Sequence, residues 1–392
     1  MTAGALRVAL AAAVVVVLIG DAIALAVHDG TGRLDAAPVP VESPLARALP
    51  RLLAFVEETR GLRFKRRVPV ELLSGDAFTE RLRDVEESDD EAGDEADAEA
   101  DAEAFASFLR VLGLVSGDLD LAAVDESVEE HGILGFYAPD EGALFVRGTS
   151  LGPFEELIVV HELTHALEDQ HCGLDRPALD ERFDESSDSF LALVEGSAVV
   201  VEARFLDSLP PEPRRVAEAD DRSVGTENHD LPPVIDALFG YPYRDGPAFV
   251  EALLAAGGRA RLDAAMVDPP TTSEQILHPD KFLAGEGPRP VRRPRADGRV
   301  EDSGVLGERV LGLVLAEAAG RSVGGRAAEG WGGDRYVLWT SGDRTCIRWN
   351  IVMDTAADTD ELVAALRSFT ARHPAAGVES TDPVVALTNC AA

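Results

Sequence analysis

The sequence predicts an α+β fold, and three stretches of the chain predict it. Residues 153–173 and 186–209 have apolar residues at helical spacing, and prolines and glycines mark their ends. Residues 135–147 have the pattern of a hairpin of two short strands. Residues 331–373 contain two more strand patterns followed by a helical one. We therefore expect a mixed sheet beside a long helix, a helical second lobe, and a small C-terminal β-β-α module.

Composition divides the chain into a main domain and a smaller module. With 392 residues, of which 46% are apolar, the chain can bury a large core. Residues 51–290 are expected to form the main domain, and residues 291–392 the C-terminal α+β module. Residues 84–103 are rich in acidic residues and contain no lysine or arginine. We expect this stretch to be a disordered, solvated insertion.

The N-terminus has the features of a targeting segment. Arg7 precedes an apolar run over residues 8–20, and Ala24-Leu25-Ala26 has the small-x-small pattern of a cleavage site. Residues 1–27 are therefore expected to be a signal peptide. Residues 8–27 are also long enough to anchor the chain in a membrane, so both alternatives stay open. Either one predicts export to the cell surface or the extracellular space, with residues 28–50 as a linker.

The charge of the chain is strongly negative. Lysine and arginine number 36 against 71 acidic residues, which gives a net charge of −35. Lys65 and Lys281 are the only lysines. Acid excess with few lysines is typical of proteins that work in high salt, where screening weakens self-repulsion. This charge argues against binding to nucleic acid or to an anionic membrane surface.

The most specific motif is His161-Glu162-Leu163-Thr164-His165, inside the helix predicted for residues 153–173. On a helix the two histidines lie one turn apart on the same face, which is the spacing that two ligands of one zinc ion need. Glu162 is adjacent to the first histidine and can reach a water on that metal. The alternative is a pair of solvated or capping histidines on an amphipathic helix.

A third metal ligand is expected on the helix over residues 186–209. Glu195 lies between Leu-Ala-Leu-Val and Gly-Ser-Ala-Val-Val-Val, and a carboxylate in such apolar surroundings needs a cation. We prefer it to Glu202, which lies nearer the polar end of the helix. Gly196, a poor helix former, would let another backbone come close. The alternative is that Glu195 pairs with an arginine.

These two helices resemble those of the gluzincin zinc peptidases, of the thermolysin and aminopeptidase type. The resemblance is carried by HELTHALED, which starts at His161, and by LVEGSA, which contains Glu195. In that family two helix histidines and a downstream glutamate hold zinc, and the motif glutamate is the general base. The resemblance implies a zincin-like catalytic domain within residues 51–290. It would bind Zn²⁺ through His161, His165 and Glu195, with Glu162 as general base.

Residues 240–258 resemble the PY-x-x-G-x-x-F/L pattern of gluzincin aminopeptidases. The tyrosine after the proline stabilises the oxyanion there, which implies this role for Tyr243; the alternative is that it caps a core helix. The family also implies that the hairpin over 135–147 aligns an extended substrate by strand addition, unless it is an ordinary sheet edge. Two departures stand out. Glu195 lies thirty positions beyond His165, more than in thermolysin-like enzymes, and the aminopeptidase substrate-amine motif is absent.

Residues 269–279, PPTTSEQILHP, are similar to a segment of poorly characterised surface proteins of halophilic microbes that pair HELTHAL with EQ-x-LHP. His278 is a candidate transition-state donor on this basis. The alternative is a structural role in the turn before Pro279. Asp169, one turn beyond His165, is a candidate orienter of the metal site.

The predicted function is that of an exported zinc metallopeptidase that acts on a peptide or protein substrate. The rival class is a non-catalytic surface protein, structural or binding, with a zinc-stabilised fold, which a fourth ligand from His171 or Cys172 would favour. A third possibility is a zinc hydrolase for other amides or esters. Cys346 and Cys390 could form a disulfide in an exported protein. The sequence does not indicate an oligomeric state.

Overall fold

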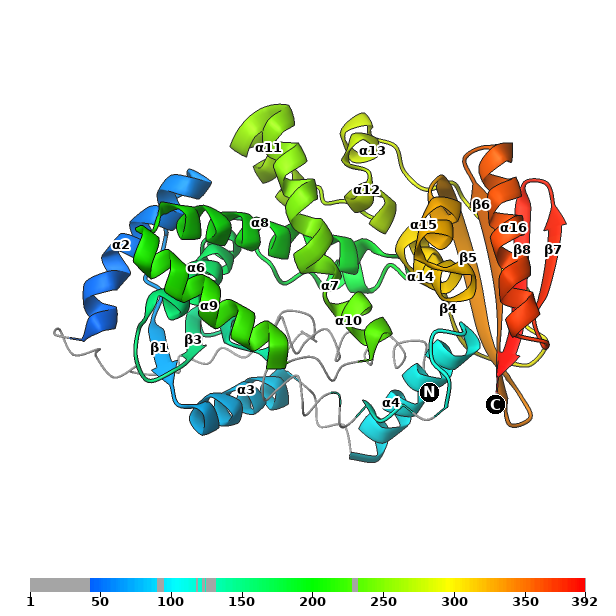
Figure 1. The fold of residues 1–392 in the computed structure, drawn as a ribbon, viewed down its shortest axis with the longest axis horizontal. Coiled ribbons are helices and arrows are strands. Elements are labelled where there is room, and N and C mark those ends of the chain that lie inside the picture. The colour runs from blue at the N-terminus through cyan, green and yellow to red at the C-terminus, as the bar shows by residue number, and fades with distance from the viewer. Residues whose placement is uncertain are drawn as a thin grey trace.

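The computed structural model describes residues 43–89, 95–117, 119–121, 124, 132–227 and 232–391, and its fold is α+β as predicted. A three-stranded and a five-stranded sheet lie at opposite ends of the molecule, with helices between them (Figure 1). The N-terminal part contains α2 (Pro44–Arg60), β1 (Val70–Leu73), α3 (Gly75–Asp89), α4 (Glu95–Val111), β2 (Gly135–Ala138), β3 (Ala143–Arg147) and α6 (Pro153–Cys172).

The three-stranded sheet has the order β1-β3-β2. β1 is parallel to β3, and β2 is antiparallel to it, which confirms the predicted hairpin. One face of the sheet packs on α6, where Leu144 and Val146 share a buried cluster with Leu163 and Leu167. Each such side chain contributes roughly 1.5–3 kcal/mol when it is fully buried. The sheet therefore fixes α6, with β2 at its edge.

Helix α6 begins and ends where the sequence predicts. Pro153 occupies the first turn, where its missing N–H costs nothing. The backbone N–H of Gly152 donates to Glu155 Oε2 at 2.7 Å. At the other end Gly173 has a φ of 66°, a conformation that glycine adopts without strain, and its N–H donates to the carbonyl of Asp169.

A helical lobe follows, as predicted. It contains α7 (Pro177–Asp180), α8 (Ser186–Ser208), α9 (Pro211–Glu227), α10 (Pro233–Phe239), α11 (Tyr241–Val267), α12 (Ser273–Leu277) and α13 (Pro279–Ala284). Helices α8 and α11 cross at two glycines. A Cβ on Gly196 would lie 2.3 Å from the carbonyl carbon of Gly246, so no side chain fits at the crossing. The expected close approach of another backbone at Gly196 is confirmed.

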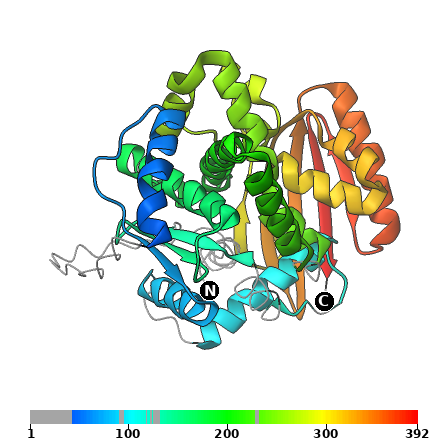
Figure 2. The ribbon, with the colours of Figure 1, turned by 60° about the vertical axis from the view of Figure 1, so that its left-hand side comes forward.

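The C-terminal module is larger than the predicted β-β-α unit. It contains β4 (Arg299–Gly304), α14 (Gly307–Ala319), α15 (Arg321–Ala328), β5 (Trp331–Ser341), β6 (Arg344–Met353), α16 (Ala356–Arg372), β7 (Gly377–Thr381) and β8 (Val384–Ala391). The antiparallel sheet has the order β4-β5-β6-β8-β7, and its three helices cover one face (Figure 2). Cys346 and Cys390 face each other on β6 and β8 and form the predicted disulfide.

The predicted linker over residues 28–50 is too long at its C-terminal end. Helix α2 begins at Pro44, because Ser43 caps it: Ser43 Oγ accepts the backbone N–H of Ala46 at 3.0 Å. Among the described residues no helix is long and apolar enough to cross a membrane. The predicted signal peptide or anchor, residues 1–27, lies outside them.

The acidic stretch over residues 84–103 differs from its predicted disorder at both ends, because helix α3 continues to Asp89 and α4 begins at Glu95; residues 90–94 lie outside the described residues. Alanine and glutamate are strong helix formers, and they dominate this stretch. The C-terminal half of α4 is amphipathic and buries Phe105 and Leu109 against the five-stranded sheet. Helix propensity and this anchoring outweigh the repulsion between the acids.

Candidate metal centre

The structure brings the three predicted metal ligands together. His161 and His165 project from the same face of α6 toward Glu195 on α8. Glu195 Oε2 lies 3.1 Å from His161 Nε2, and Glu195 Oε1 lies 3.3 Å from His165 Nε2. One ligand atom from each residue can be chosen so that all three lie within 4.8 Å of one another. Glu195 therefore does not pair with an arginine, which was the alternative.

The donor set fits a zinc ion. His165 and Glu195 are buried, with 3% and 0% of their surface exposed. Within the described part of the chain, His165 Nε2 and Glu195 Oε1 make no hydrogen bond, although they face each other. Buried polar atoms without partners are costly, and a cation among them would satisfy both. Two imidazole nitrogens and one carboxylate oxygen are a common ligand set for zinc with one open position.

The pKa values of these groups show that they stabilise positive charge. Burial acts to lower the pKa of His161, but hydrogen bonds to Glu195 and Glu202 outweigh it and raise the pKa well above 6.5. Burial would raise the pKa of Glu195, yet His165 and His161 lower it to about 2. The negative charge of Glu195 beside the two imidazoles would also favour a metal ion there.

Glu202, which was not predicted as a ligand, also lies at the candidate site. Its Oε2 lies 3.0 Å from Nδ1 of His161, the nitrogen that faces away from Glu195. Carboxylates in this position fix the tautomer and the ring orientation of a metal-binding histidine. The sequence holds a signal for it, because Glu202 follows Glu195 by two helical turns and so lies on the same face of α8.

Glu162 lies beside the ligands and beneath the edge strand. Only 7% of its surface is exposed. Burial raises its pKa, while the neighbouring charges of His161 and His165 act to lower it. A Cβ on Gly135, the first residue of β2, would lie 3.3 Å from Glu162 Cγ and 2.5 Å from Ile158 Cγ2. Strand β2 therefore passes directly over the predicted general base, and only glycine fits there.

Tyr243 also reaches the site, from the first turn of α11. Its ring stacks on that of His161, with 6.4 Å between ring centroids. Burial raises the pKa of its phenol well above 10, and the charges of Glu195 and Glu162 raise it further. The hydroxyl therefore stays protonated and can donate a hydrogen bond.

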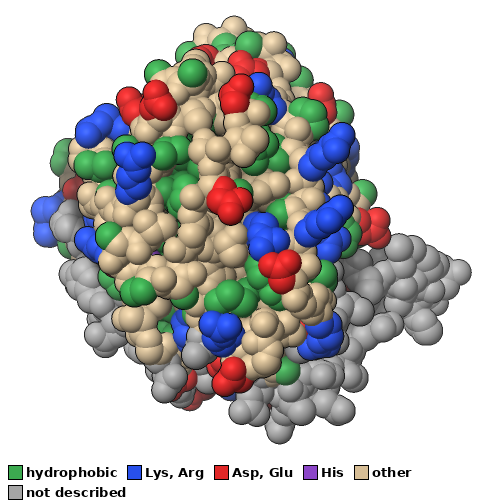
Figure 3. Space-filling model, turned by 90° about the vertical axis from the view of Figure 1, so that its right-hand side faces the viewer, with side chains coloured by type: hydrophobic (Ala, Val, Ile, Leu, Met, Phe, Trp, Pro, Cys, Tyr) green, Lys and Arg blue, Asp and Glu red, His purple; other side chains and the backbone are tan. Residues whose placement is uncertain are grey.

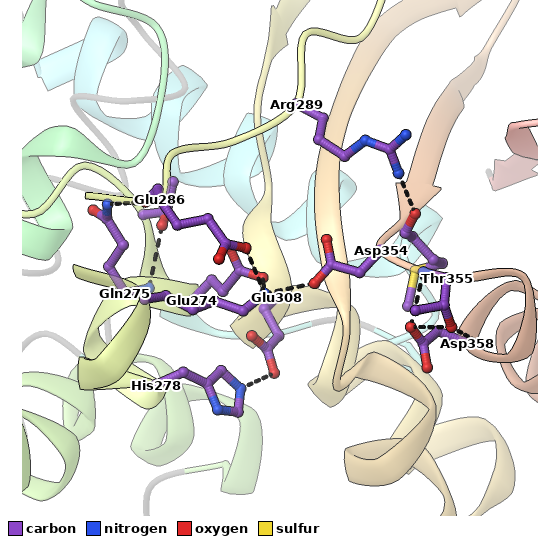
Figure 4. Close-up of polar contacts among 12 residues, drawn as sticks. Glu274, Gln275, His278, Glu286, Arg289, Glu308, Asp354, Thr355 and Asp358 are labelled. Atoms are coloured by element: carbon purple, nitrogen blue, oxygen red, sulfur yellow. Dashed lines mark hydrogen bonds and ion pairs between the residues drawn. The ribbon is translucent and has the colours of Figure 1, made fainter. Parts of the chain in front are cut away.

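His278 lies elsewhere, at the junction with the C-terminal module. Its Nε2 is 2.9 Å from Oε1 of Glu308 on α14 (Figure 4). Glu274, in the same EQ-x-LHP segment, also takes part in contacts at this junction. Glu274 pairs with Lys281, which also binds Asp354 at 2.6 Å. These contacts match the structural alternative for His278.

Three other candidates near the end of α6 (Asp169, His171 and Cys172) make hydrogen bonds to groups other than the candidate ligands. Asp169 is not an orienter of the histidines, because it accepts hydrogen bonds from the hydroxyl of Tyr137 and the backbone N–H of Leu174. Cys172 Sγ contacts the carbonyl of Glu168, and His171 Nε2 the carbonyl of Arg63.

A buried ion pair lies behind the ligands. Glu168 Oε1 accepts Arg60 Nε at 2.7 Å and Ser197 Oγ at 2.5 Å. Arg60 also binds Asp263 at 3.1 Å. The network joins α2, α6, α8 and α11 around the two helices that carry the candidate metal ligands. Removing one partner would leave a buried charge unpaired, which is strongly destabilising.

Comparisons with known proteins cover only the C-terminal module. Residues 294–389 match a family model described as "Domain of unknown function (DUF8575)". No curated protein and no solved structure matches the chain. The metal centre lies outside the matched residues.

Proposed function

We propose that this protein is an exported zinc metallopeptidase of gluzincin type with a zincin-like catalytic domain. The observation that carries the proposal is the convergence of His161, His165 and Glu195 on one point, where, among the described residues, the buried atoms His165 Nε2 and Glu195 Oε1 face each other without a hydrogen bond. The targeting pattern of residues 1–27 supports export, and the acidic composition supports a high-salt environment.

Each remaining group has a task in peptide hydrolysis. A bound zinc ion would act as a Lewis acid and lower the pKa of a water at its open position towards ~7. Glu162 takes a proton from the attacking water on its carboxylate and delivers it to the leaving amine. Tyr243 donates its hydroxyl hydrogen to the carbonyl oxygen as negative charge develops there. Glu202 holds the ring of His161 in place.

The position of the edge strand β2 is an argument for a peptide substrate. β2 lies at one end of the sheet order β1-β3-β2 and begins over Glu162. An extended peptide could add to this edge through backbone hydrogen bonds and so present one of its carbonyl groups to the metal centre. This placement favours peptides over small amides or esters.

The alternative function is a non-catalytic surface protein whose zinc site stabilises the fold. A structural zinc site of this kind would have a fourth protein ligand that closes the coordination shell. Cys172 and His171, the two candidates, bind backbone carbonyls instead. Among the described residues the group that can hold a metal has three members, which favours the enzyme.

The test combines metal analysis with a proteolysis assay in high salt. The wild type should bind about one zinc ion and cleave an unfolded protein substrate. Glu162→Gln should keep the zinc and the fold but lose about 10²–10⁴-fold in kcat, because general-base assistance is gone. Cleavage within a few-fold of the wild type would contradict the mechanism. Stoichiometric zinc in a His161→Ala, His165→Ala variant would contradict the site.

A further inference from the structure

An arginine of the C-terminal module reaches into the helical lobe. Arg309, in the first turn of α14, extends its guanidinium to the turn between α10 and α11. Its Nη2 donates to the carbonyl of Ala237 at 3.0 Å and also to the carbonyl of Leu238. Its Cζ lies 4.0 Å from the ring centroid of Tyr241. One side chain thus binds the end of α10 and the start of α11.

Arg309 is itself held firmly. Its backbone N–H donates to Ser273 Oγ at 3.2 Å, which fixes the base of the side chain against α12. The carbonyls that it binds lie at the C-terminal end of α10, where the helix dipole favours a cation. The flat guanidinium can bond to two carbonyls while it stacks on an aromatic ring, which an ammonium group cannot do equally well.

The turn that Arg309 binds presents Tyr243 to the metal centre. Gly240 separates α10 from α11, and Tyr241 and Tyr243 both lie in the first turn of α11. From there the ring of Tyr243 stacks on His161. Farther along α11 the backbone is fixed by the crossing of Gly246 with α8. The start of α11 is also tied to α10 by Arg244, whose Nη2 donates to the carbonyls of Asp236 and Ala237. Arg309 adds a contact that comes from the C-terminal module.

We propose that Arg309 is a positioning residue for Tyr243, so that the C-terminal module completes the active site. The proposal rests on the proposed function for its effect on catalysis, but the placement of Tyr243 can be measured without activity. A displacement of about 1 Å in a reacting group can cost on the order of 100-fold in rate. The module would then be a part of the enzyme rather than an appended binding domain.

The experiment compares Arg309→Gln with Arg335→Gln in the full chain. Arg335 is a matched control, because it also bridges the module and the helical lobe: its Nη1 donates to the carbonyl of Phe183 at 3.0 Å, away from the α10–α11 turn. Tyrosine labelled in the ring gives few NMR signals, since the chain has four tyrosines. The variant Tyr243→Phe identifies the signal of Tyr243, which senses the ring current of His161.

We expect the Tyr243 signal to move in Arg309→Gln and to stay in place in Arg335→Gln, with zinc content unchanged in both. With a peptide substrate, kcat should fall about 100-fold in Arg309→Gln, close to the loss in Tyr243→Phe. The double variant should lose little more than either single one, because both changes remove the same interaction. KM should change much less than kcat.

A Tyr243 signal that is unchanged in Arg309→Gln would overturn the proposal, and so would additive losses in the double variant. If Arg309→Gln fails to fold, Arg309→Lys replaces it in the experiment. It keeps the positive charge but cannot bridge both carbonyls in the same geometry, so the Tyr243 signal should again move. A wild type without zinc or hydrolysis would refute the proposed function alone, because the NMR comparison decides the positioning without either.

Discussion

Glu195 and Glu202 lie on one face of α8, yet they serve different ends of the same histidine. Glu195 faces the Nε2 atoms of both histidines, and Glu202 faces Nδ1 of His161. The apolar surroundings of Glu195 in the sequence were enough to predict a ligand there. The role of Glu202 depends on the rotation of α8 against α6, which comes from tertiary packing and has no local signal beyond the two-turn spacing.

The two carboxylates should differ in their effect on zinc affinity. Glu195→Ala removes a predicted ligand and should abolish tight zinc binding, and the metal-free protein should also lose stability because the buried histidines lose their charged partner. Glu202→Ala should weaken zinc binding by about 10–100-fold, because His161 is no longer oriented. Competition with a fluorescent chelator measures both. Glu251→Ala, an exposed glutamate of α11, is the control and should bind zinc like the wild type. Equal affinities for Glu202→Ala and this control would contradict the orienting role.

At the scale of elements, the crossing of α8 and α11 sets the distance between Glu195 and Tyr243. Gly196 follows Glu195 directly, and Gly246 follows Tyr243 within one helical turn. Close contact of the two backbones therefore sets how near Glu195, the proposed third ligand, lies to Tyr243, the proposed oxyanion donor. Gly196, a poor helix former inside a long helix, predicted a close approach of another backbone. The sequence did not indicate that this backbone belongs to α11.

Gly196→Ala should push these helices apart. The added Cβ would lie 2.3 Å from the carbonyl carbon of Gly246, and overpacking of this kind costs about 1–3 kcal/mol or more. Chemical denaturation should show the loss, together with lower activity. Gly325→Ala, in helix α15 with open space around it, should be neutral or more stable by up to about 1 kcal/mol. A Gly196→Ala variant as stable as Gly325→Ala would show that the crossing is not tight.

Glu185 couples the start of α8 to the C-terminal module and should make stability depend on pH. Its carboxyl group lies against Gly307 at the start of α14. Burial raises the pKa of Glu185 from 4.5 to about 8, against a hydrogen bond from Ser273 that lowers it. A group whose folded pKa is raised contributes stability below the unfolded pKa. That contribution is lost as pH rises from about 4.5 to about 8.

Glu185→Gln should remove this dependence. Relative to the wild type, the variant should gain unfolding free energy as pH rises through that window, by on the order of a few kcal/mol in total. Urea denaturation at a series of pH values measures the difference. Glu181→Gln, exposed in the same loop, should follow the wild type. A constant difference between Glu185→Gln and the wild type would show that the carboxyl group titrates normally.

The elements were predictable to different degrees, and the reason is physical. Helices α6 and α8 have strong local signals, namely Pro153, Gly173 and Pro210 at their ends and apolar faces between. The predicted disorder of residues 84–103 was wrong for α3 and α4, because the charge pattern hid their helix propensity and the anchoring by Phe105. Strands β4, β7 and β8 were missed. β4 and β8 pair with β5 and β6, which lie far away along the chain, and the pairing of β7 depends on β8.

At the scale of the whole molecule, the charge is unevenly distributed. Residues 291–392 contain 12 arginines and 14 acidic residues, so nearly all the excess of acid lies in the rest of the chain. Arginine and lysine side chains are spread over the end of the molecule that the C-terminal module forms (Figure 3). Self-repulsion should therefore act mainly in the domain that carries the candidate metal centre.

The melting temperature should rise with salt for this reason. Between 0.1 M and 1 M salt the Debye length falls from about 10 Å to about 3 Å, which screens repulsion between neighbouring acidic groups. Thermal unfolding followed by circular dichroism gives the curve. Sodium and potassium chloride at equal ionic strength should produce the same rise, since screening depends on ionic strength. A flat or falling curve would contradict adaptation to high salt.

The strand order of the C-terminal module has a consequence for biosynthesis. β8 lies between β6 and β7, although it follows both of them along the chain. A ribosome therefore delivers an interior strand after its neighbours, and a nascent chain that stops before Val384 lacks the strand that joins β7 to β6. Helix α14, which carries Arg309, packs on that sheet. It can therefore reach its final position only after β8 has been added. Helices α6 and α8, which carry the candidate metal ligands, are made long before, and on the proposed function the protein would become active only when synthesis of the module is complete.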